Sequence, residues 1–151
     1  MIKSIFYVKR EHLKIKCILN RIDGFFNEDK INHLNVIKEF EDLKRIWDKH
    51  ERGEEELLYF FKQFVQKPFP NGTMFIEQHK QFKGHWKVLQ DAINSEDLSK
   101  LDVALDTDGR MFIRKLREHI DAEDKFFDSF VVRKEDTADS DTEILETYKN
   151  L

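Results

Sequence analysis

The chain has 151 residues and a formal net charge of −4, which predicts one mildly acidic domain with its own core. Only 5 glycines and 2 prolines are available for turns, which disfavours a many-stranded sheet and favours long helices. Lysines and arginines do not gather without acidic neighbours, so nucleic acid is not expected as a partner. No apolar stretch approaches the roughly 20 residues of a membrane-spanning helix, so no membrane association is expected.

The single cysteine, Cys17, excludes a disulfide within the chain and a cysteine-ligated metal cluster. We expect Cys17 to be a small core residue. We also expect the protein to be cytoplasmic, because thiols stay reduced there.

Two segments in the first half place apolar residues three or four positions apart, the spacing of one face of a bundle helix. The first covers about residues 5–26, with Ile5, Val8, His12, Ile15, Leu19, Ile22 and Phe26 on its inner face. The second runs from about 31 to about 66, with Phe40, Leu43, Trp47, His50, Glu54, Leu57, Phe61 and Phe64 facing inward. The segment KPFPNGT (67–73) then predicts an extended connection that returns along the bundle, and Thr73 is expected to cap the next helix.

The second half repeats the pattern. The third helix is expected to turn Phe75, His79, Phe82, Trp86, Leu89 and Ile93 inward. A linker follows with a short helix through Leu98, Leu101 and Leu105, and residues 107–109 predict a break. The last helix places Phe112, Leu116, His119, Glu123, Phe126 and Phe130 inward. The predicted fold is all-α, an up-down-up-down four-helix bundle over 1–132, with a polar C-terminal tail or short docked helix over 133–151.

Six inward positions are polar: His12, His50, Glu54, His79, His119 and Glu123. Buried imidazole and carboxylate groups without partners are costly, so these residues must satisfy one another or a shared ligand. Residues four apart share a helix face, so each HxxxE pair offers a nitrogen and a carboxylate to a common point. Four imidazoles and two carboxylates exceed the needs of one tetrahedral zinc. They suit two iron ions bridged by the carboxylates, with coordination positions left open.

The ordered series of histidine, HxxxE, histidine and HxxxE resembles the haemerythrin-like, or HHE cation-binding, family. The matching segments are REHLKIK (His12), HERGEEELL (His50 and Glu54), FIEQHKQF (His79) and HIDAEDKFF (His119 and Glu123). The resemblance covers Ile5 to Phe130. It implies a non-haem di-iron centre, oxo- or hydroxo-bridged, in which the histidines are terminal ligands and the two glutamates bridge.

Two residues bear on the subfamily. Oxygen-carrying haemerythrins have a second histidine four residues along the third helix, where this chain has Lys83. This departure favours the four-histidine subfamilies, which resemble iron-centre repair and nitric-oxide-responsive proteins. The carriers also place an aspartate five residues after the last histidine, the position of Asp124. Helical geometry favours Glu123 as the bridging carboxylate, because position i+5 points away from the inner face, and Asp124 is the alternative.

Several residues near the six are interpreted as supporting ones. His33 and His85 are read as surface or boundary histidines, although His85, like Tyr59, could approach the metals. Glu55 could orient a ligand. Ferritin-like di-iron bundles use ExxH pairs, which this chain lacks before His50, His79 and His119. A metal-free interaction bundle would leave the polar inner positions unexplained.

The expected function is that of a cytoplasmic di-iron protein that binds dioxygen, nitric oxide or peroxide for sensing, scavenging or reduction. One alternative is iron storage and donation for iron–sulfur centre repair, which would need a protein partner. Another is an iron-responsive regulatory module without catalysis. The sequence does not separate these roles, and a monomer or weak dimer is expected.

Overall fold

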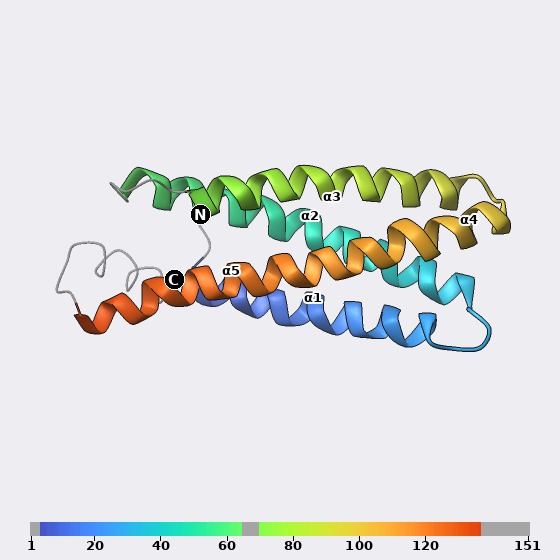
Figure 1. The fold of residues 1–151 in the computed structure, drawn as a ribbon, viewed down its shortest axis with the longest axis horizontal. Helices are drawn as coiled ribbons and strands as arrows, with labels where there is room; N and C mark the ends of the chain where they lie inside the picture. The colour runs from blue at the N-terminus through green and yellow to red at the C-terminus, as the bar shows by residue number, and fades with distance from the viewer. Residues whose placement is uncertain (1–3, 65–69, 137–151) are drawn as a thin grey trace.

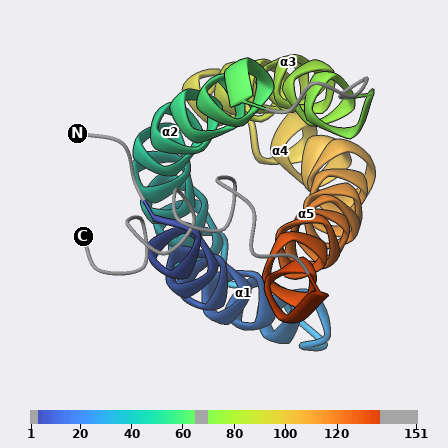
Figure 2. The ribbon, with the colours of Figure 1, turned by 90° about the vertical axis from the view of Figure 1, so that its left-hand side faces the viewer.

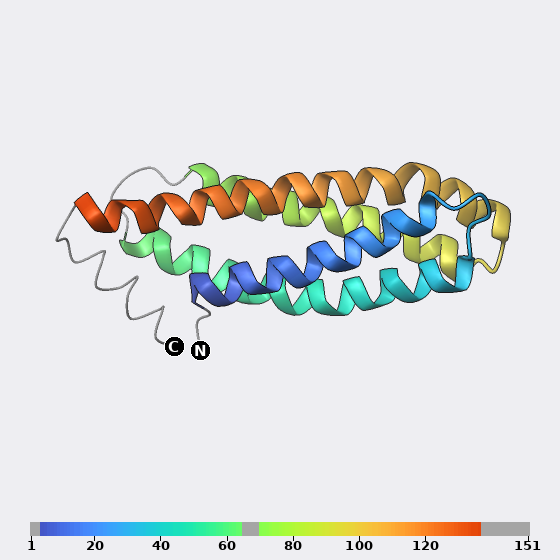
Figure 3. The same cartoon turned by 90° about the horizontal axis from the view of Figure 1, so that it is seen from below.

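The structure is a computed structural model that describes residues 4–64 and 70–136, except for the side chains of residues 64, 70, 71 and 130–136. Four long helices run antiparallel: α1 (Ile5–Phe26), α2 (His33–Phe64), α3 (Pro70–Asn94) and α5 (Arg110–Asp136). Each contacts its two neighbours in the order α1, α2, α3, α5, so the four surround one interior (Figures 1 and 2). Figure 3 shows α1 between α2 and α5. The predicted all-α four-helix bundle is confirmed.

Short polar side chains mark where several helices begin. The Ser4 hydroxyl accepts a hydrogen bond from the backbone N–H of Tyr7 at the start of α1. The side-chain oxygen of Asn32 accepts one from the backbone N–H of Asn35 at the start of α2. Asp97 caps the short helix α4 (Leu98–Ala104) in the same way. These bonds satisfy N–H groups that a helix leaves unpaired at its N-terminus.

The prediction of an extended connection through residue 73, with Thr73 as a cap, is wrong, because α3 begins at Pro70. Proline is tolerated in a first helical turn, where no intrahelical hydrogen bond is lost and its fixed φ suits the helix. Glu54 lies ten residues before the end of α2, and His79 nine residues after the start of α3. The earlier start therefore brings these residues to similar depths. Residues 67–69 lie outside the described residues.

The predicted break at residues 107–109 is also wrong. A π-helical turn, η1 (Leu105–Gly109), joins α4 to α5 without leaving the helical path. Leu105 is buried, and the hydroxyl of Thr107 donates a hydrogen bond to the carbonyl of Val103 at 2.7 Å. A π turn accommodates an extra residue within a helix, so turn-forming residue types remain helical here.

Apolar side chains form two clusters along the bundle. The larger one includes Ile15, Leu19, Phe40, Trp47, Phe82 and Leu116, and the smaller one includes Ile5, Val8, Leu57, Phe61, Phe75 and Phe127. On each long helix the predicted polar inner positions fall between residues of the two clusters. The polar residues therefore occupy one layer with a dry core on both sides.

Most predicted inward positions with described side chains are buried, with two differences in detail. Ile93 is half-buried, and on α5 the fully buried ring is that of Phe127 while Phe126 is half-buried. Phe64 and Phe130 lie outside the described side chains. Cys17 is exposed, so the prediction that it lies in the core is wrong. Its side chain is not on the buried face of α1.

The last helix continues past Val132 to Asp136, into the segment predicted as a tail. Residues 137–151 lie outside the described residues, so the division into 1–132 and 133–151 stays a prediction. None of the described helices combines the length and apolar character needed to cross a bilayer.

Candidate metal centre

The structure brings the six predicted polar residues together in the middle of the bundle. We call them the central cluster: His12 of α1, His50 and Glu54 of α2, His79 of α3, and His119 and Glu123 of α5. Each is at most 2% exposed. They form two overlapping groups of potential metal ligands. The first donor group is His12, His50, Glu54 and Glu123, and the second is Glu54, His79, His119 and Glu123.

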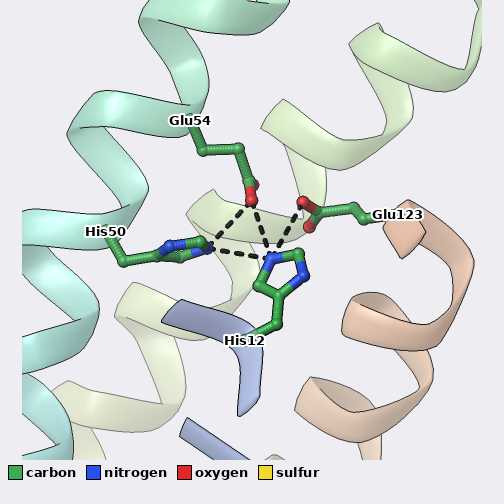
Figure 4. A group of neighbouring side chains, drawn as sticks. All are labelled: His12, His50, Glu54 and Glu123. Atoms are coloured by element: carbon green, nitrogen blue, oxygen red, sulfur yellow. Dashed lines mark hydrogen bonds and ion pairs between the residues drawn. The ribbon is translucent and has the colours of Figure 1, made fainter. Parts of the chain in front are cut away.

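In the first donor group, helices α1, α2 and α5 each direct ligand atoms to one point (Figure 4). The Nε2 atoms of His12 and His50 are 3.1 Å apart. Glu54 Oε2 lies 3.1 Å from the first of these nitrogens and 2.9 Å from the second. Glu123 Oε2 lies 3.7 Å from His12 Nε2. Three helices thus converge on one potential ion position.

The second donor group repeats this arrangement with α3 in place of α1. The Nε2 atoms of His79 and His119 are 3.1 Å apart. Glu54 Oε1 lies 3.0 Å from His79 Nε2 and 3.9 Å from His119 Nε2. Glu123 Oε1 contacts His119 Nε2 and lies 3.9 Å from His79 Nε2.

The two glutamates therefore divide their oxygens between the groups. Glu54 and Glu123 each turn Oε2 toward the first donor group and Oε1 toward the second. Both oxygens of Glu123 and Oε1 of Glu54 are buried and accept no hydrogen bond from the described residues. Buried carboxylate oxygens are normally hydrogen-bonded or bound to a metal. These oxygens, together with two imidazole nitrogens per group, suit a pair of divalent cations.

The outer nitrogen of every histidine in the cluster is held by a side chain from a neighbouring helix. The Nδ1 pairs are His12 with Asp124 (2.7 Å), His50 with Glu11 (3.1 Å), His79 with Glu55 (3.0 Å) and His119 with Gln78 (2.6 Å). A carboxylate or amide oxygen can only accept, so Nδ1 carries the donated proton in each pair. In a neutral ring, Nε2 then keeps its lone pair for a metal. Such partners orient the ring and increase its strength as a ligand.

These outer partners occupy regular positions in the sequence. Glu11 and Gln78 each precede a cluster histidine, and Glu55 and Asp124 each follow a cluster glutamate. The outer partners thus come from equivalent sequence positions in the α1–α2 pair and in the α3–α5 pair. Sequence reasoning anticipated only Glu55 in this role and missed Glu11 and Gln78. The repeated acidic or amide residue beside a residue of the central cluster was the signal that could have found them.

Burial and neighbouring charges set the protonation of the metal-free cluster. Burial disfavours the charged form of His12, but hydrogen bonds with Asp124 and Glu54 outweigh it and raise the pKa of His12 to about 9. Burial lowers the pKa of His119 to about 3. Burial also raises the pKa of Glu123 well above its usual range. Glu54 behaves oppositely: burial would raise its pKa, but His50 and the hydrogen bonds around it hold that pKa well below the usual value.

Aromatic rings pack around the imidazoles. The centroid of the Trp47 indole lies 5.2 Å from that of His50, 5.5 Å from that of His79 and 5.9 Å from that of His119. Phe82 meets His119 edge to face, with centroids 5.1 Å apart. These contacts limit ring rotation and keep water from this side of the cluster.

Other residues considered from the sequence lie outside both donor groups. Tyr59 is 52% exposed. His85 Nδ1 is 3.4 Å from Asp108, and His33 Nε2 is 2.5 Å from Asp102. Lys83, which is 69% exposed, extends to Glu51 on α2.

In a comparison with protein families, the model of the hemerythrin HHE cation binding domain matches residues 4–128. The matched segment includes all six residues of the central cluster. No curated protein and no solved structure matched the chain.

Proposed function

The chain belongs to the hemerythrin HHE cation binding domain family, and we propose that its central cluster holds two iron ions that together bind a small electron-rich ligand. The family match confirms the resemblance drawn from the histidine and HxxxE series. It also agrees with a buried cluster suited to metal cations. The identity of the metal, the number of ions and the ligand are the proposed part.

One observation carries this proposal: each shared glutamate turns one oxygen to each donor group. A carboxylate in this position can bridge two cations, and the two histidines of each group complete a set of four donors. Iron commonly accepts more than four ligands, so such a set leaves positions for an exogenous ligand.

Charge favours the same conclusion. Among the six potential ligands, the two carboxylates neutralise only half the charge of two ferrous ions. The next carboxylates, those of Asp124, Glu11 and Glu55, lie on the outer nitrogens of the histidines. An ion pair whose direct ligands leave positive charge attracts anions and strong electron donors to its open positions. When bound, an iron pair supplies open coordination positions and redox chemistry for dioxygen, nitric oxide or peroxide.

The chain's own residues prepare the site for this role. Asp124, Glu11, Glu55 and Gln78 orient the four imidazoles. Trp47 and Phe82 exclude water from the layer. The protein therefore presents four imidazole rings and two carboxyl groups in a fixed arrangement.

The test begins with anaerobic reconstitution of the metal-free protein with Fe²⁺, Mn²⁺ or Zn²⁺, followed by metal analysis. We expect about two iron ions per chain. The ferrous protein is then exposed to dioxygen or nitric oxide while its visible absorption is recorded. A reversible spectral change supports ligand binding, and rapid irreversible oxidation supports redox turnover. Absence of bound iron, or an iron-loaded protein whose spectrum responds to neither gas nor peroxide, would refute the proposal.

A further inference from the structure

A second set of potential ligands lies beside the central cluster on the α2–α3 side. Glu51 and Glu55 of α2, which we call the outer acidic pair, lie close to Nδ1 of His79. Glu55 Oε1 is 3.0 Å from this nitrogen and Glu51 Oε1 is 3.8 Å from it. His79 thus faces the outer acidic pair with Nδ1 and the second donor group with Nε2.

Glu51 is unusual for a carboxylate outside the central cluster. It is only 5% exposed, and its Oε1 accepts no hydrogen bond from the described residues. Among the described residues, the ammonium of Lys83 is paired with it, with Nζ 3.6 Å away. Like charges four residues apart on a helix repel each other, so the outer acidic pair favours a further cation between its members.

Lys83 is a displaceable partner for this pair. Its side chain is 69% exposed, so the ammonium sits at the solvent boundary on a flexible stem. An incoming divalent cation can replace it at Glu51 while the lysine turns to water. Glu55 can keep one oxygen on His79 and offer the other, since a carboxylate has two oxygens and about four acceptor positions.

The donor group next to the pair is also the one with weaker support. In the first donor group both outer acceptors are carboxylates, Asp124 and Glu11. In the second donor group, His79 donates to the carboxylate of Glu55, whereas His119 donates to the neutral amide of Gln78. A carboxylate partner makes an imidazole a stronger ligand than an amide does. The second donor group should therefore hold its ion less tightly.

We propose that the outer acidic pair is a transit site for a divalent cation, through which the ion of the second donor group exchanges with solvent. The cation binds Glu51 and Glu55 with water completing its coordination, then passes the His79 ring to the inner position. The inference rests on the proposed metal centre and adds a route to it.

The experiment follows anaerobic Fe²⁺ uptake by the full-length, metal-free protein in a stopped-flow instrument, with final iron content measured separately. Glu51→Gln keeps the size of the side chain and removes its charge. We expect it to slow uptake about tenfold, within the range of electrostatic effects on association, and to leave the final iron content unchanged. Lys83→Gln removes the competing ammonium and should speed uptake.

Glu56→Gln is the matched control, because Glu56 is exposed on the same helix and loses the same charge. It should load at the wild-type rate. Thermal unfolding of each metal-free variant checks that the fold is kept.

A second measurement uses the iron-loaded protein titrated with Mn²⁺ and observed by electron paramagnetic resonance. We expect one weak additional Mn²⁺ site that Glu51→Gln removes. Uptake by Glu51→Gln at the wild-type rate, or a lower final iron content at an unchanged rate, would overturn the transit site while leaving the metal centre standing. If the wild-type protein takes up no iron, the proposed function itself fails.

Discussion

Replacing Glu123 by glutamine separates the metal-binding role proposed for this residue from its role in folding. Burial raises the pKa of Glu123 well above its usual range in the metal-free protein, which favours the neutral carboxyl group. Glutamine has nearly the same volume and is also neutral. We therefore expect the free energy of unfolding of the metal-free protein to change by less than about 1.5 kcal/mol.

The metal-loaded protein should respond very differently. With free metal at a hundred times the dissociation constant, each ion adds about 2.7 kcal/mol of stability, so two add about 5 kcal/mol. For a chain of this size, that raises the unfolding temperature by about 10–20 °C. Glu123 gives one oxygen to each donor group, so its loss weakens both positions. A 100-fold loss at each leaves about 1 kcal/mol in total, and a rise of less than about 4 °C.

Differential scanning fluorimetry with and without Fe²⁺, under anaerobic conditions, measures both quantities. Glu118→Gln serves as the control, because Glu118 is exposed on the same helix and loses the same charge. The control should show the full metal-induced rise. If Glu123→Gln also shows the full rise and keeps its iron, the bridging role assigned to Glu123 is incorrect.

Four further predictions follow from the site and its helices. His12→Gln and His119→Gln each remove a donor from one group only, so metal analysis should find about one ion per chain in each, and unchanged content would contradict the two-group arrangement. Asp124→Asn should lower metal affinity about 10–100-fold in a chelator competition. An affinity equal to that of the wild-type protein would contradict a role for Asp124 in orienting His12. With a pKa of about 9, His12 carries an extra proton at pH 7 in the metal-free protein. Metal binding should therefore release this proton, and metal affinity should increase as the pH rises to about 9. Calorimetry in buffers of different ionisation enthalpy should detect the released proton, and identical heats in all buffers would argue against its release. Gly84→Ala, where an added Cβ meets no atom within 4 Å, should raise the free energy of unfolding in urea by about 0.5–1 kcal/mol without altering iron content.

The sequence by itself predicted the helices and the residues that face their interior. Helical periodicity is a local property of each helix. His12, spaced three or four residues from Val8 and Ile15, therefore faces inward independently of the other helices, and so does His79 between Phe75 and Phe82. The pairing of His50 with Glu54 needed only the i, i+4 relation within one helix. For this reason the structure gathers all six predicted residues, although their role as metal ligands stays a prediction.

Local signals failed where the context of the rest of the bundle outweighed residue preferences. Pro70 lies inside a helix because the first turn has no hydrogen bond for proline to remove. Gly109 stays helical because the π turn continues into α5 and packs its backbone near the rings of Phe26 and Phe40. Propensity is a weak guide when packing supports the other conformation.

Only the tertiary structure decided which side chain holds which imidazole. Glu11 contacts His50 on another helix and Asp124 reaches from α5 to His12. Such contacts depend on the rotation and axial register of one helix against the next, which no spacing within a single helix specifies. The same register placed Glu51 beside His79. The residues of the central cluster could thus be predicted from the chain, whereas their outer partners and the position of the outer acidic pair arise from how four helices meet.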